Sequence, residues 1–270
     1  MEYVTAAGVE VPALGFGTWP MTGETCREAV ESALDLGYRH LDTAQMYDNH
    51  DAVGAAIANA GVDREAVFLT TKILRRNLAY DDLLETFAAD LDDLGTDYVD
   101  LLLIHAPSRS VPIEESIRAM NRLQSEGRVD HIGVSNFSVD QLRTAIGASE
   151  TPILTNQVEY HPYRDRSDLL PVCIEEDVIL TAYTPFADGR VHDEAVLREI
   201  GDRYGKTPAQ VTLRWLLQQT SVAAVPKARS RTHQRENLDV FDFRLTGAEM
   251  ERVFDLGGGL VGRLRSVLGF

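Results

Sequence analysis

Short apolar and β-branched runs alternate with longer amphipathic stretches along almost the whole chain. The short runs have the length of β-strands, and the stretches between them repeat apolar residues at helical spacing. Continuously apolar strands separated by helices are typical of a parallel sheet that is covered by helices. Eight strands are predicted, at residues 13–19, 40–44, 67–72, 98–105, 131–136, 153–160, 178–185 and 222–227.

Several of the helical stretches open on acidic residues or proline and close at glycine, as helix ends do. The clearest are residues 26–37, 81–95, 112–127 and 193–205, and the acidic residues of 81–95 predict a solvated face. Eight βα units within 270 residues favour an α/β fold, the closed (β/α)8 TIM barrel. The count alone also fits an open doubly wound sheet.

The chain shows no internal repeat beyond this rhythm and no Pro/Gly-rich linker, so we expect a single domain over residues 1–270. Residues 2–12 predict a small β-hairpin with Gly8 near its turn. In a barrel, such a hairpin would plug the bottom.

The composition is that of an ordinary globular protein, with 44% hydrophobic and 25% charged residues. No apolar run approaches the length of about 18 residues that a membrane span needs, and the N-terminal residues do not resemble a signal peptide. We therefore expect a cytoplasmic protein that does not bind membranes. The only two cysteines, Cys26 and Cys173, lie far apart, so neither a disulfide nor a metal site is expected.

The formal net charge of −16 argues against nucleic acid as a partner, because binding a polyanion needs clustered basic residues. The 26 basic residues include only three lysines, Lys72, Lys206 and Lys227. An acidic excess with so little lysine resembles halophilic proteins, in which high salt screens the repulsion between like charges. We expect the stability of this protein to rise with added KCl.

Four residues stand at the carboxyl ends of neighbouring predicted strands, where a (β/α)8 barrel builds its active site. Asp42 lies on the second strand, Lys72 closes the third, His105 closes the fourth, and Tyr47 follows Asp42 by a loop-length step. Taken singly, each has a structural explanation, as a helix cap, a surface charge, a satisfied histidine or a packing aromatic.

Together, the four residues suit the delivery of a proton to a carbonyl oxygen. A lysine ammonium lowers the pKa of a neighbouring phenol, and a carboxylate keeps that lysine charged. A histidine at the same point can hydrogen-bond a carbonyl and orient it.

Other motif matches are weaker. Gly257, Gly259 and Gly262 form a GxGxxG pattern, but no βαβ unit follows it. The stretch GVSNF is not a nucleophile elbow, because Phe137 replaces the final glycine. His161 has no partner at metal-ligand spacing, which indicates a structural role.

Seven motifs occur in the order found in one family: GYRHLDTAQMYDNH, FLTTK, DYVDLLLIHAP, IGVSNF, NQVEYHP, AYTPF and VPKARSRTHQRENL. The chain resembles the aldo-keto reductase superfamily from about residue 13 to 243, and is most similar to its diketogluconate-reductase and small aldehyde-reductase branch. The resemblance implies a monomeric barrel that reduces small carbonyl substrates with NADP(H) or NAD(H). It implies Tyr47 as general acid, Asp42 and Lys72 as the pair that lowers its pKa, and His105 as the donor that orients the carbonyl.

The same resemblance implies a set of cofactor-binding residues: Gly17, Thr18, Asp42, Ser135, Asn136, Gln157, Tyr183, Lys227, Arg229, His233, Glu236 and Asn237. Ser135, Asn136 and Gln157 would bind the nicotinamide carboxamide, and Tyr183 would stack on its ring. Asn136 also has the explanation of a helix cap, and Tyr183 that of barrel packing.

The phosphate-binding pattern departs from that of the family. The family has a serine after the lysine and an arginine six residues after it, where this chain has Ala228 and His233. Losing a hydroxyl and a guanidinium fork weakens recognition of a 2′-phosphate. Arg229 and Arg231 are candidates to compensate, and we expect relaxed use of both cofactors.

The residues expected at the substrate side of the pocket also differ from those of the family. Ala106 stands where the family often has tryptophan, and only a short segment follows Phe243, so the C-terminal loop is expected to be reduced. With Trp19, Tyr47 and His105 as its walls, the pocket is expected to be open and permissive.

Two other functions compete with that of a reductase. One is a catalytically idle nucleotide-binding sensor or partner subunit on the same fold, although the four intact site residues argue against it. The other is an unrelated barrel lyase or isomerase that uses Lys72 as a Schiff base.

Overall fold

The computed structural model describes residues 1–257, and it places eight parallel strands in one sheet in the order β10-β9-β8-β7-β6-β5-β4-β3. Each strand falls on one of the eight predicted from the sequence. Their bounds are β3 (Phe16–Gly17), β4 (His40–Asp42), β5 (Phe68–Ile73), β6 (Val99–Ile104), β7 (Val129–Ser135), β8 (Ile153–Glu159), β9 (Ile179–Tyr183) and β10 (Val222–Ala224).

The two ends of this sheet meet, which closes the barrel. Leu14 pairs in parallel with Ala224, Gly15 N donates to Ala224 O at 2.8 Å, and Ala224 N donates to Ala13 O at 2.8 Å. The predicted (β/α)8 barrel is confirmed, and the open doubly wound sheet is excluded because it would leave these strand edges unpaired.

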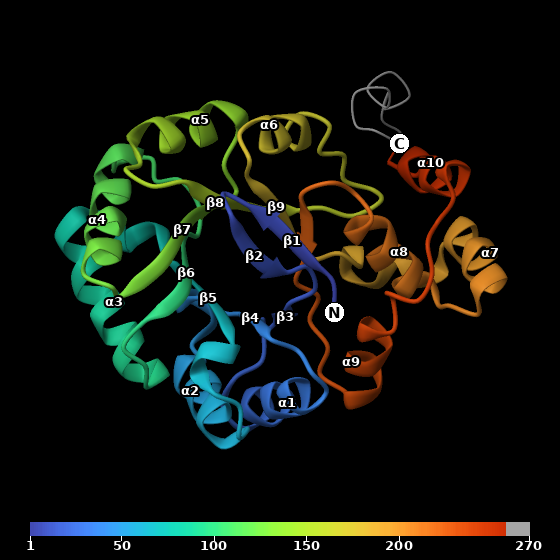
Figure 1. Cartoon of the computed structure of the whole chain (residues 1–270), viewed down its shortest axis with the longest axis horizontal. Coiled ribbons are helices and arrows are strands. Elements are labelled where there is room, and N and C mark those ends of the chain that lie inside the picture. The colour runs from blue at the N-terminus through green and yellow to red at the C-terminus, as the bar shows by residue number, and fades with distance from the viewer. Residues whose placement is uncertain (258–270) are drawn as a thin grey trace.

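Helices surround the barrel (Figure 1). The α-helices are α1 (Gly23–Asp35), α2 (His50–Asn59), α3 (Tyr80–Leu94), α4 (Ile113–Ser125), α5 (Val139–Ala148), α6 (Leu170–Glu175), α7 (Ala195–Tyr204), α8 (Pro208–Leu217), α9 (Arg231–Leu238) and α10 (Gly247–Asp255). Within residues 1–257, four 3-10 turns connect elements: η1 (Gln45–Tyr47), η2 (Arg64–Ala66), η3 (Arg75–Asn77) and η4 (Ala187–Asp193). Among residues 1–257, no helix is both long and apolar enough to cross a membrane.

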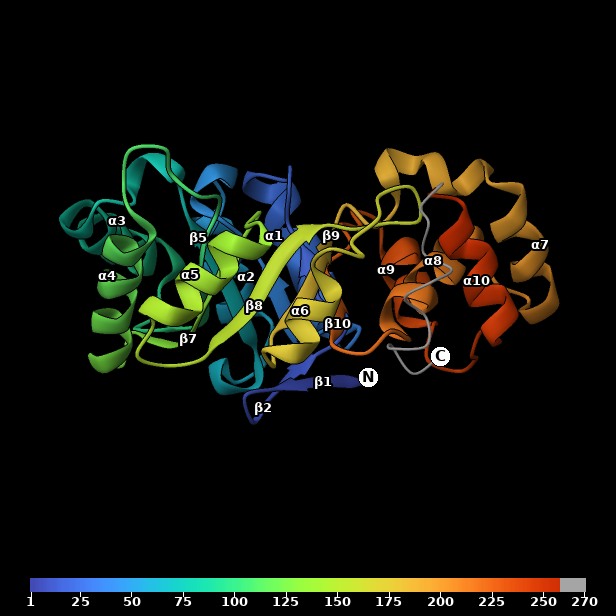
Figure 2. The same ribbon diagram turned by 90° about the horizontal axis from the view of Figure 1, so that it is seen from above.

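The predicted N-terminal hairpin covers the bottom of the barrel (Figure 2). It pairs β1 (Tyr3–Ala6) with β2 (Val9–Pro12), and its two turn residues, Ala7 and Gly8, have φ of 50° and 78°, as a tight hairpin turn requires. Its inward side chains pack on apolar residues of the barrel interior: Ala6 and Val11 against Leu101, Leu103, Leu154, Ile179 and Ala223. The barrel is therefore closed at this end.

Helix α3 shows how the amphipathic pattern builds the outer layer, and where it has an exception. Leu83, Phe87, Leu91 and Leu94 recur at helical spacing and are buried against the barrel. The solvated acidic face predicted for this helix does not include Asp90, which is buried. A buried carboxylate needs polar partners, and those of Asp90 are Gln45, on the turn that carries Tyr47, and His50 of α2.

The glycine pattern at residues 257–262 and the shape of the C-terminal segment fall largely on residues 258–270, outside the described part of the chain.

Candidate active site

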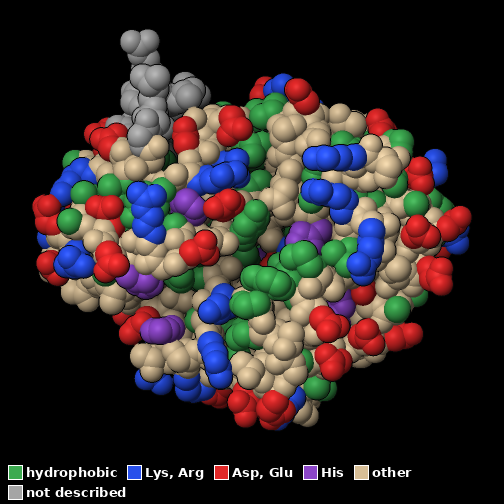
Figure 3. Space-filling model, turned by 180° about the vertical axis from the view of Figure 1, so that it is seen from behind, with side chains coloured by type: hydrophobic (Ala, Val, Ile, Leu, Met, Phe, Trp, Pro, Cys, Tyr) green, Lys and Arg blue, Asp and Glu red, His purple; other side chains and the backbone are tan. Residues whose placement is uncertain are grey.

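A cleft of about 1060 Å³ opens at the carboxyl ends of the barrel strands. It lies on the face opposite the hairpin, where Figure 3 shows a hollow bordered by hydrophobic and histidine side chains. Most of the residues predicted for the site line it: Gly17, Trp19, Asp42, Tyr47, His105, Ser135, Asn136, Gln157, Tyr183, Lys227, His233, Glu236 and Asn237. Thr18, Lys72 and Arg229 are not among the lining residues.

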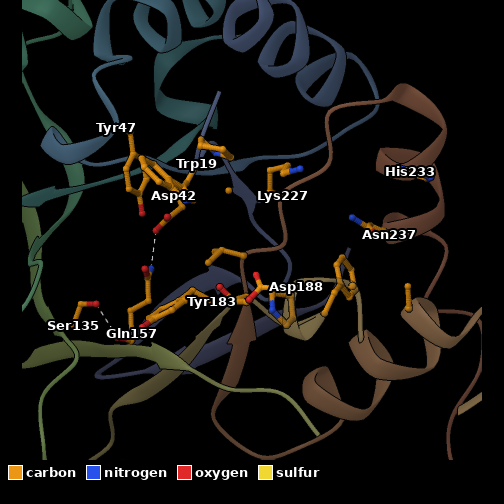
Figure 4. A pocket seen from close by; sticks show the side chains of 18 of the residues that line it. Trp19, Asp42, Tyr47, Ser135, Gln157, Tyr183, Asp188, Lys227, His233 and Asn237 are labelled. Carbon is orange, nitrogen blue, oxygen red and sulfur yellow. Dashed lines mark hydrogen bonds between the residues drawn. The ribbon is translucent and has the colours of Figure 1, made fainter. Parts of the chain in front are cut away.

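Lys72 lies behind the cleft wall and contacts both Asp42 and Tyr47. Its Nζ donates to Asp42 Oδ1 at 2.6 Å, to Thr43 O at 2.9 Å and to the Tyr47 hydroxyl oxygen at 3.3 Å. The side chain is only 1% exposed, so these bonds replace its contact with water. The second oxygen of Asp42 accepts a hydrogen bond from Gln157 Nε2 at 2.7 Å (Figure 4).

The pKa of Tyr47 is raised, contrary to the lowering expected from the sequence. Burial of the phenol raises its pKa, Lys72 lowers it, and the carboxylate of Asp42 adds to the increase. Burial therefore outweighs the lysine, and the phenol keeps its proton at neutral pH. For Lys72, burial opposes charging, but Asp42 and Tyr47 together raise its pKa, so the ammonium stays charged.

His105 follows the last residue of β6, and its ring centroid lies 5.9 Å from that of Tyr47. Burial and the neighbouring charge of Lys72 lower the pKa of His105 to about 4, so the imidazole is neutral at pH 7. Its Nδ1 is buried and has no hydrogen-bond partner within residues 1–257. A neutral imidazole with a free ring nitrogen at a cleft wall is suited to bind a polar ligand atom.

The facing wall of the cleft comes from the ends of β7, β8 and β9. Asn136 has φ of 62°, and its side chain donates to His105 O at 3.0 Å and accepts from the Tyr183 hydroxyl at 2.9 Å. It does not cap α5, because Ser138 does so in a capping box with Gln141. Tyr183 is partly exposed at the cleft rather than packed inside the barrel.

Gly17 and Thr18 have structural reasons for their identities. A Cβ at Gly17 would lie 2.7 Å from Val225 O, where the first and last strands approach each other. The Thr18 hydroxyl is fully buried and donates to Asp42 O at 3.1 Å. Thr18 thus supports the end of β4 that carries Asp42.

The far end of the cleft lies between the segment after β10 and helix α9. Lys227, His233 and Asn237 lie along this part, at a distance from Tyr47 (Figure 4). Asn237 Nδ2 is buried and has no hydrogen-bond partner in the described part of the chain. An orphaned buried amide at a cleft wall indicates a ligand group that completes its bonding.

Arg231 is not an unpaired cation at the far end of the cleft, because its guanidinium is paired on the helix α1 side. Its Nη2 donates to Asp35 Oδ2 at 2.6 Å, and its Nη1 donates to Ser32 Oγ at 3.3 Å, so it connects α9 to α1. Ala228, which replaces the serine of the family pattern, is buried. Arg229 is exposed and lies two residues after Lys227, which lines the cleft.

Several cleft residues were missed by the sequence analysis, chiefly Met46 and the segment of η4. Asp188 and Gly189, with φ of 53° and 94°, and His192 line the cleft. The signal was available, because an Asp-Gly pair just after the strand at 178–185 marks a turn at the same mouth.

A family model described as "Aldo/keto reductase family" matches residues 13–256, almost the entire described chain. The chain belongs to the aldo/keto reductase family. The resemblance read from its motifs is therefore confirmed, and the matched segment contains every residue of the site described above.

Similar proteins support the same assignment. Over 91% of its length, this aldo/keto reductase is 36% identical to the glyoxal reductase of Bacillus subtilis, 89% of which is covered. It is 37% identical to the morphine 6-dehydrogenase of Pseudomonas putida, covering 94% of this chain and 90% of that one. A structure described as a 2,5-diketo-D-gluconic acid reductase B matches with a TM-score of 0.93 at 45% identity, over 95% and 91% of the two chains. This aldo/keto reductase is thus an oxidoreductase of carbonyl compounds that uses a nicotinamide cofactor.

Proposed function

We propose that this protein reduces small aldehydes or ketones to alcohols with NADPH, and also accepts NADH, with Tyr47 as the general acid. The observation that carries the proposal is the partly buried contact of 3.3 Å between the Tyr47 hydroxyl and the Lys72 ammonium. It joins a phenol that keeps its proton to a cation that stabilises the phenolate left after proton transfer.

The residues divide the reaction between them. When bound, the reduced nicotinamide supplies a hydride to the carbonyl carbon. Tyr47 gives its proton to the carbonyl oxygen, and the product is an alcohol. Lys72 stabilises the resulting phenolate, Asp42 keeps Lys72 charged and in place, and the neutral imidazole of His105 orients the carbonyl by a hydrogen bond.

The cleft fits a dinucleotide along its length. Its volume of about 1060 Å³ exceeds what a small carbonyl compound alone would need. Ser135, Asn136 and Gln157 would hold the carboxamide end, and Tyr183 would stack on the ring. Asn237, whose amide lacks a partner, would hold the adenine end beside Glu236.

Relaxed cofactor use follows from the far end of the cleft. Of the described residues around this end of the cleft, Lys227, Arg229 and His233 are the candidates to contact a 2′-phosphate, because Arg231 is already paired with Asp35. A histidine there lacks the planar fork of donors by which an arginine binds phosphate, and the hydroxyl of the family pattern is absent. We therefore expect comparable kcat/KM for NADPH and NADH.

The substrate end of the cleft is open and apolar. Trp19 is 50% exposed and its ring lies 5.2 Å from that of Tyr47, and the neighbouring Met46 is 48% exposed. These side chains offer a flat wall rather than an enclosed pocket, which supports a permissive choice of substrate.

A Schiff base on Lys72 is disfavoured. Such a lysine must be a free, accessible amine, whereas Lys72 is buried and charged and donates to three oxygens.

The test is cofactor oxidation with a panel of small aldehydes and ketones, measured with NADPH and with NADH, beside Tyr47→Phe. Turnover that is lost in Tyr47→Phe, while cofactor binding is kept, supports the proposal. Tight nucleotide binding without turnover on any carbonyl would instead favour a sensor.

A further inference from the structure

A buried polar network lies behind the turn that carries Tyr47. Gln45, two residues before Tyr47 in η1, donates from Nε2 to Asp90 Oδ2 of α3 at 2.7 Å. The other end of its amide, Oε1, accepts from Leu74 N at 2.8 Å and from Asn77 Nδ2 at 3.1 Å. One side chain thus ties η1 to a helix and to the segment that follows β5.

The same carboxylate also connects to the strand that carries Lys72. Asp90 Oδ1 lies 3.4 Å from His50 Nδ1, and His50 Nε2 lies 2.8 Å from the hydroxyl oxygen of Thr71, the residue before Lys72 on β5. Asp90 and His50 are each 7% exposed, so water does not replace these contacts. The turn of Tyr47 and the strand of Lys72 are therefore both tied, through different side chains, to Asp90.

The residues of this network do not contact the cleft directly. Gln45, His50 and Asp90 are not among the cleft-lining residues. Their polar atoms bond to one another, to the side chains of Thr71 and Asn77 and to the backbone. Met46 and Tyr47 directly follow Gln45 and do line the cleft. A displacement of Gln45 would therefore move the proton donor without removing any group that contacts a ligand.

We propose that Gln45, anchored by Asp90, is a positioning residue that sets the distance between the Tyr47 hydroxyl and the Lys72 ammonium. The inference rests on the proposed function of Tyr47 as proton donor. Catalysis depends steeply on such distances, because a misplacement of about 1 Å can cost about a hundredfold in rate. Without the two sets of hydrogen bonds of Gln45, the contact between the Tyr47 hydroxyl and Lys72 would remain as a side-chain hydrogen bond of η1, and its length could change.

The test compares Gln45→Leu, which removes both sets of bonds at similar volume, with the double variant Gln45→Glu/Asp90→Asn. In the double variant the carboxylate moves to position 45 and accepts from the new amide at position 90, from Leu74 N and from Asn77. Every bond can therefore form again, with donor and acceptor exchanged only between positions 45 and 90. Asp93→Asn, an exposed change on the same helix, is the matched control.

We expect Gln45→Leu to lower kcat by about ten- to a hundredfold, with a much smaller change in the Kd of NADPH. In the protein without cofactor, NMR of ¹³C-labelled tyrosine should show a changed pKa for Tyr47 in this variant, because a displaced phenol would differ both in its distance from Lys72, which lowers the pKa, and in its burial, which raises it. A merely structural role would not move this pKa. The double variant should recover kcat to within about threefold of the wild type. The control Asp93→Asn should have the kcat of the wild type.

Wild-type kcat and an unchanged Tyr47 pKa in Gln45→Leu would overturn the inference while leaving the proposed function standing. The same holds if the double variant loses as much rate as Gln45→Leu. Failure of the proposed function is distinct, since Tyr47→Phe would then turn over carbonyls as fast as the wild type.

Discussion

Lys72 Nζ lies 2.6 Å from Asp42 Oδ1, and both side chains are almost completely buried, at 1% and 4% exposure. Taking two charges out of water is expensive, and a buried ion pair often stabilises a fold no better than apolar residues of the same size. Stability therefore does not explain why this ion pair is present. The third contact of Lys72, with the Tyr47 hydroxyl, does explain it. The arrangement places a fixed positive charge beside a phenol at the cleft wall.

Tyr47→Phe should abolish most of the reductase activity. It removes only the hydroxyl that would donate the proton, so we expect kcat to fall by about 10²–10⁴. The Kd of the cofactor, measured by quenching of protein fluorescence, should change little. Tyr3→Phe, an exposed position on the hairpin, should keep full activity. Equal rates for Tyr47→Phe and the wild type would exclude Tyr47 as the acid.

Lys72→Met should destabilise the protein, because it leaves the Asp42 carboxylate buried without its cation. Breaking a buried pair from one side costs about 3–5 kcal/mol, which should appear as a clear fall in Tm. Replacing both partners, as in Lys72→Met/Asp42→Leu, should recover much of that loss while activity stays absent. Lys227→Met, an exposed change, should leave Tm near that of the wild type. If the single and double variants are equally unstable, the buried charge is not the cause.

His105 should make stability depend on pH in the acid range. Its pKa is about 4 in the folded protein and about 6.5 when unfolded, so below pH 6.5 the unfolded chain binds a proton that the folded protein does not. This contribution therefore destabilises the fold progressively as the pH falls from 6.5 towards 4. Chemical denaturation of the wild type and His105→Gln between pH 4 and 7 should show a smaller slope for the variant. A titration of His105 near 6.5 by NMR would contradict the prediction.

Asp35→Asn should shift cofactor preference towards NADPH. The change releases Arg231 from an exposed ion pair, and such pairs contribute about 0.2–1 kcal/mol, so the gain should be at most about fivefold. The readout is the equilibrium Kd of NADPH and NADH for the free enzyme. Glu28→Gln, an exposed change of equal charge on the same helix, is the control and should alter neither Kd. A gain of the same size for NADH would mean that Arg231 does not reach the phosphate.

Added KCl should raise Tm, because it screens the repulsion that a net charge of −16 creates within the fold. The comparison is thermal unfolding at low and at molar KCl, with sucrose as a control for general solute effects. A Tm that is flat or falls with KCl would remove the halophilic interpretation.

The architecture and much of the site can be predicted from the sequence, for a physical reason. A parallel strand buried on both faces must be apolar throughout, so a charged residue such as Asp42 or Lys72 at its carboxyl end stands out. The link between Gln45 and Asp90 was not readable, because Asp90 shares its charge and spacing with solvated neighbours. Its contacts with Gln45 and His50, which are distant in the sequence, distinguish it in the fold. The pairing of Arg231 with Asp35, 196 residues apart, was hidden in the same way.

The net effect on Tyr47 was mispredicted for a related reason. Sequence neighbours identify the lysine that lowers the pKa of a phenol, but the depth at which the phenol is buried depends on how the loops close over it. Burial was the larger effect here.

The hairpin closes the bottom of the barrel, so the face that carries it can be labelled chemically without touching the face that carries the cleft. Both native cysteines are buried, and burial raises the pKa of Cys26 to about 11 and that of Cys173 to about 12, so neither thiol is reactive at neutral pH. A single cysteine introduced at the exposed Tyr3 of the hairpin would thus take up a maleimide selectively. Coupled to a bead through that thiol, the enzyme would be oriented with its cleft towards the solution.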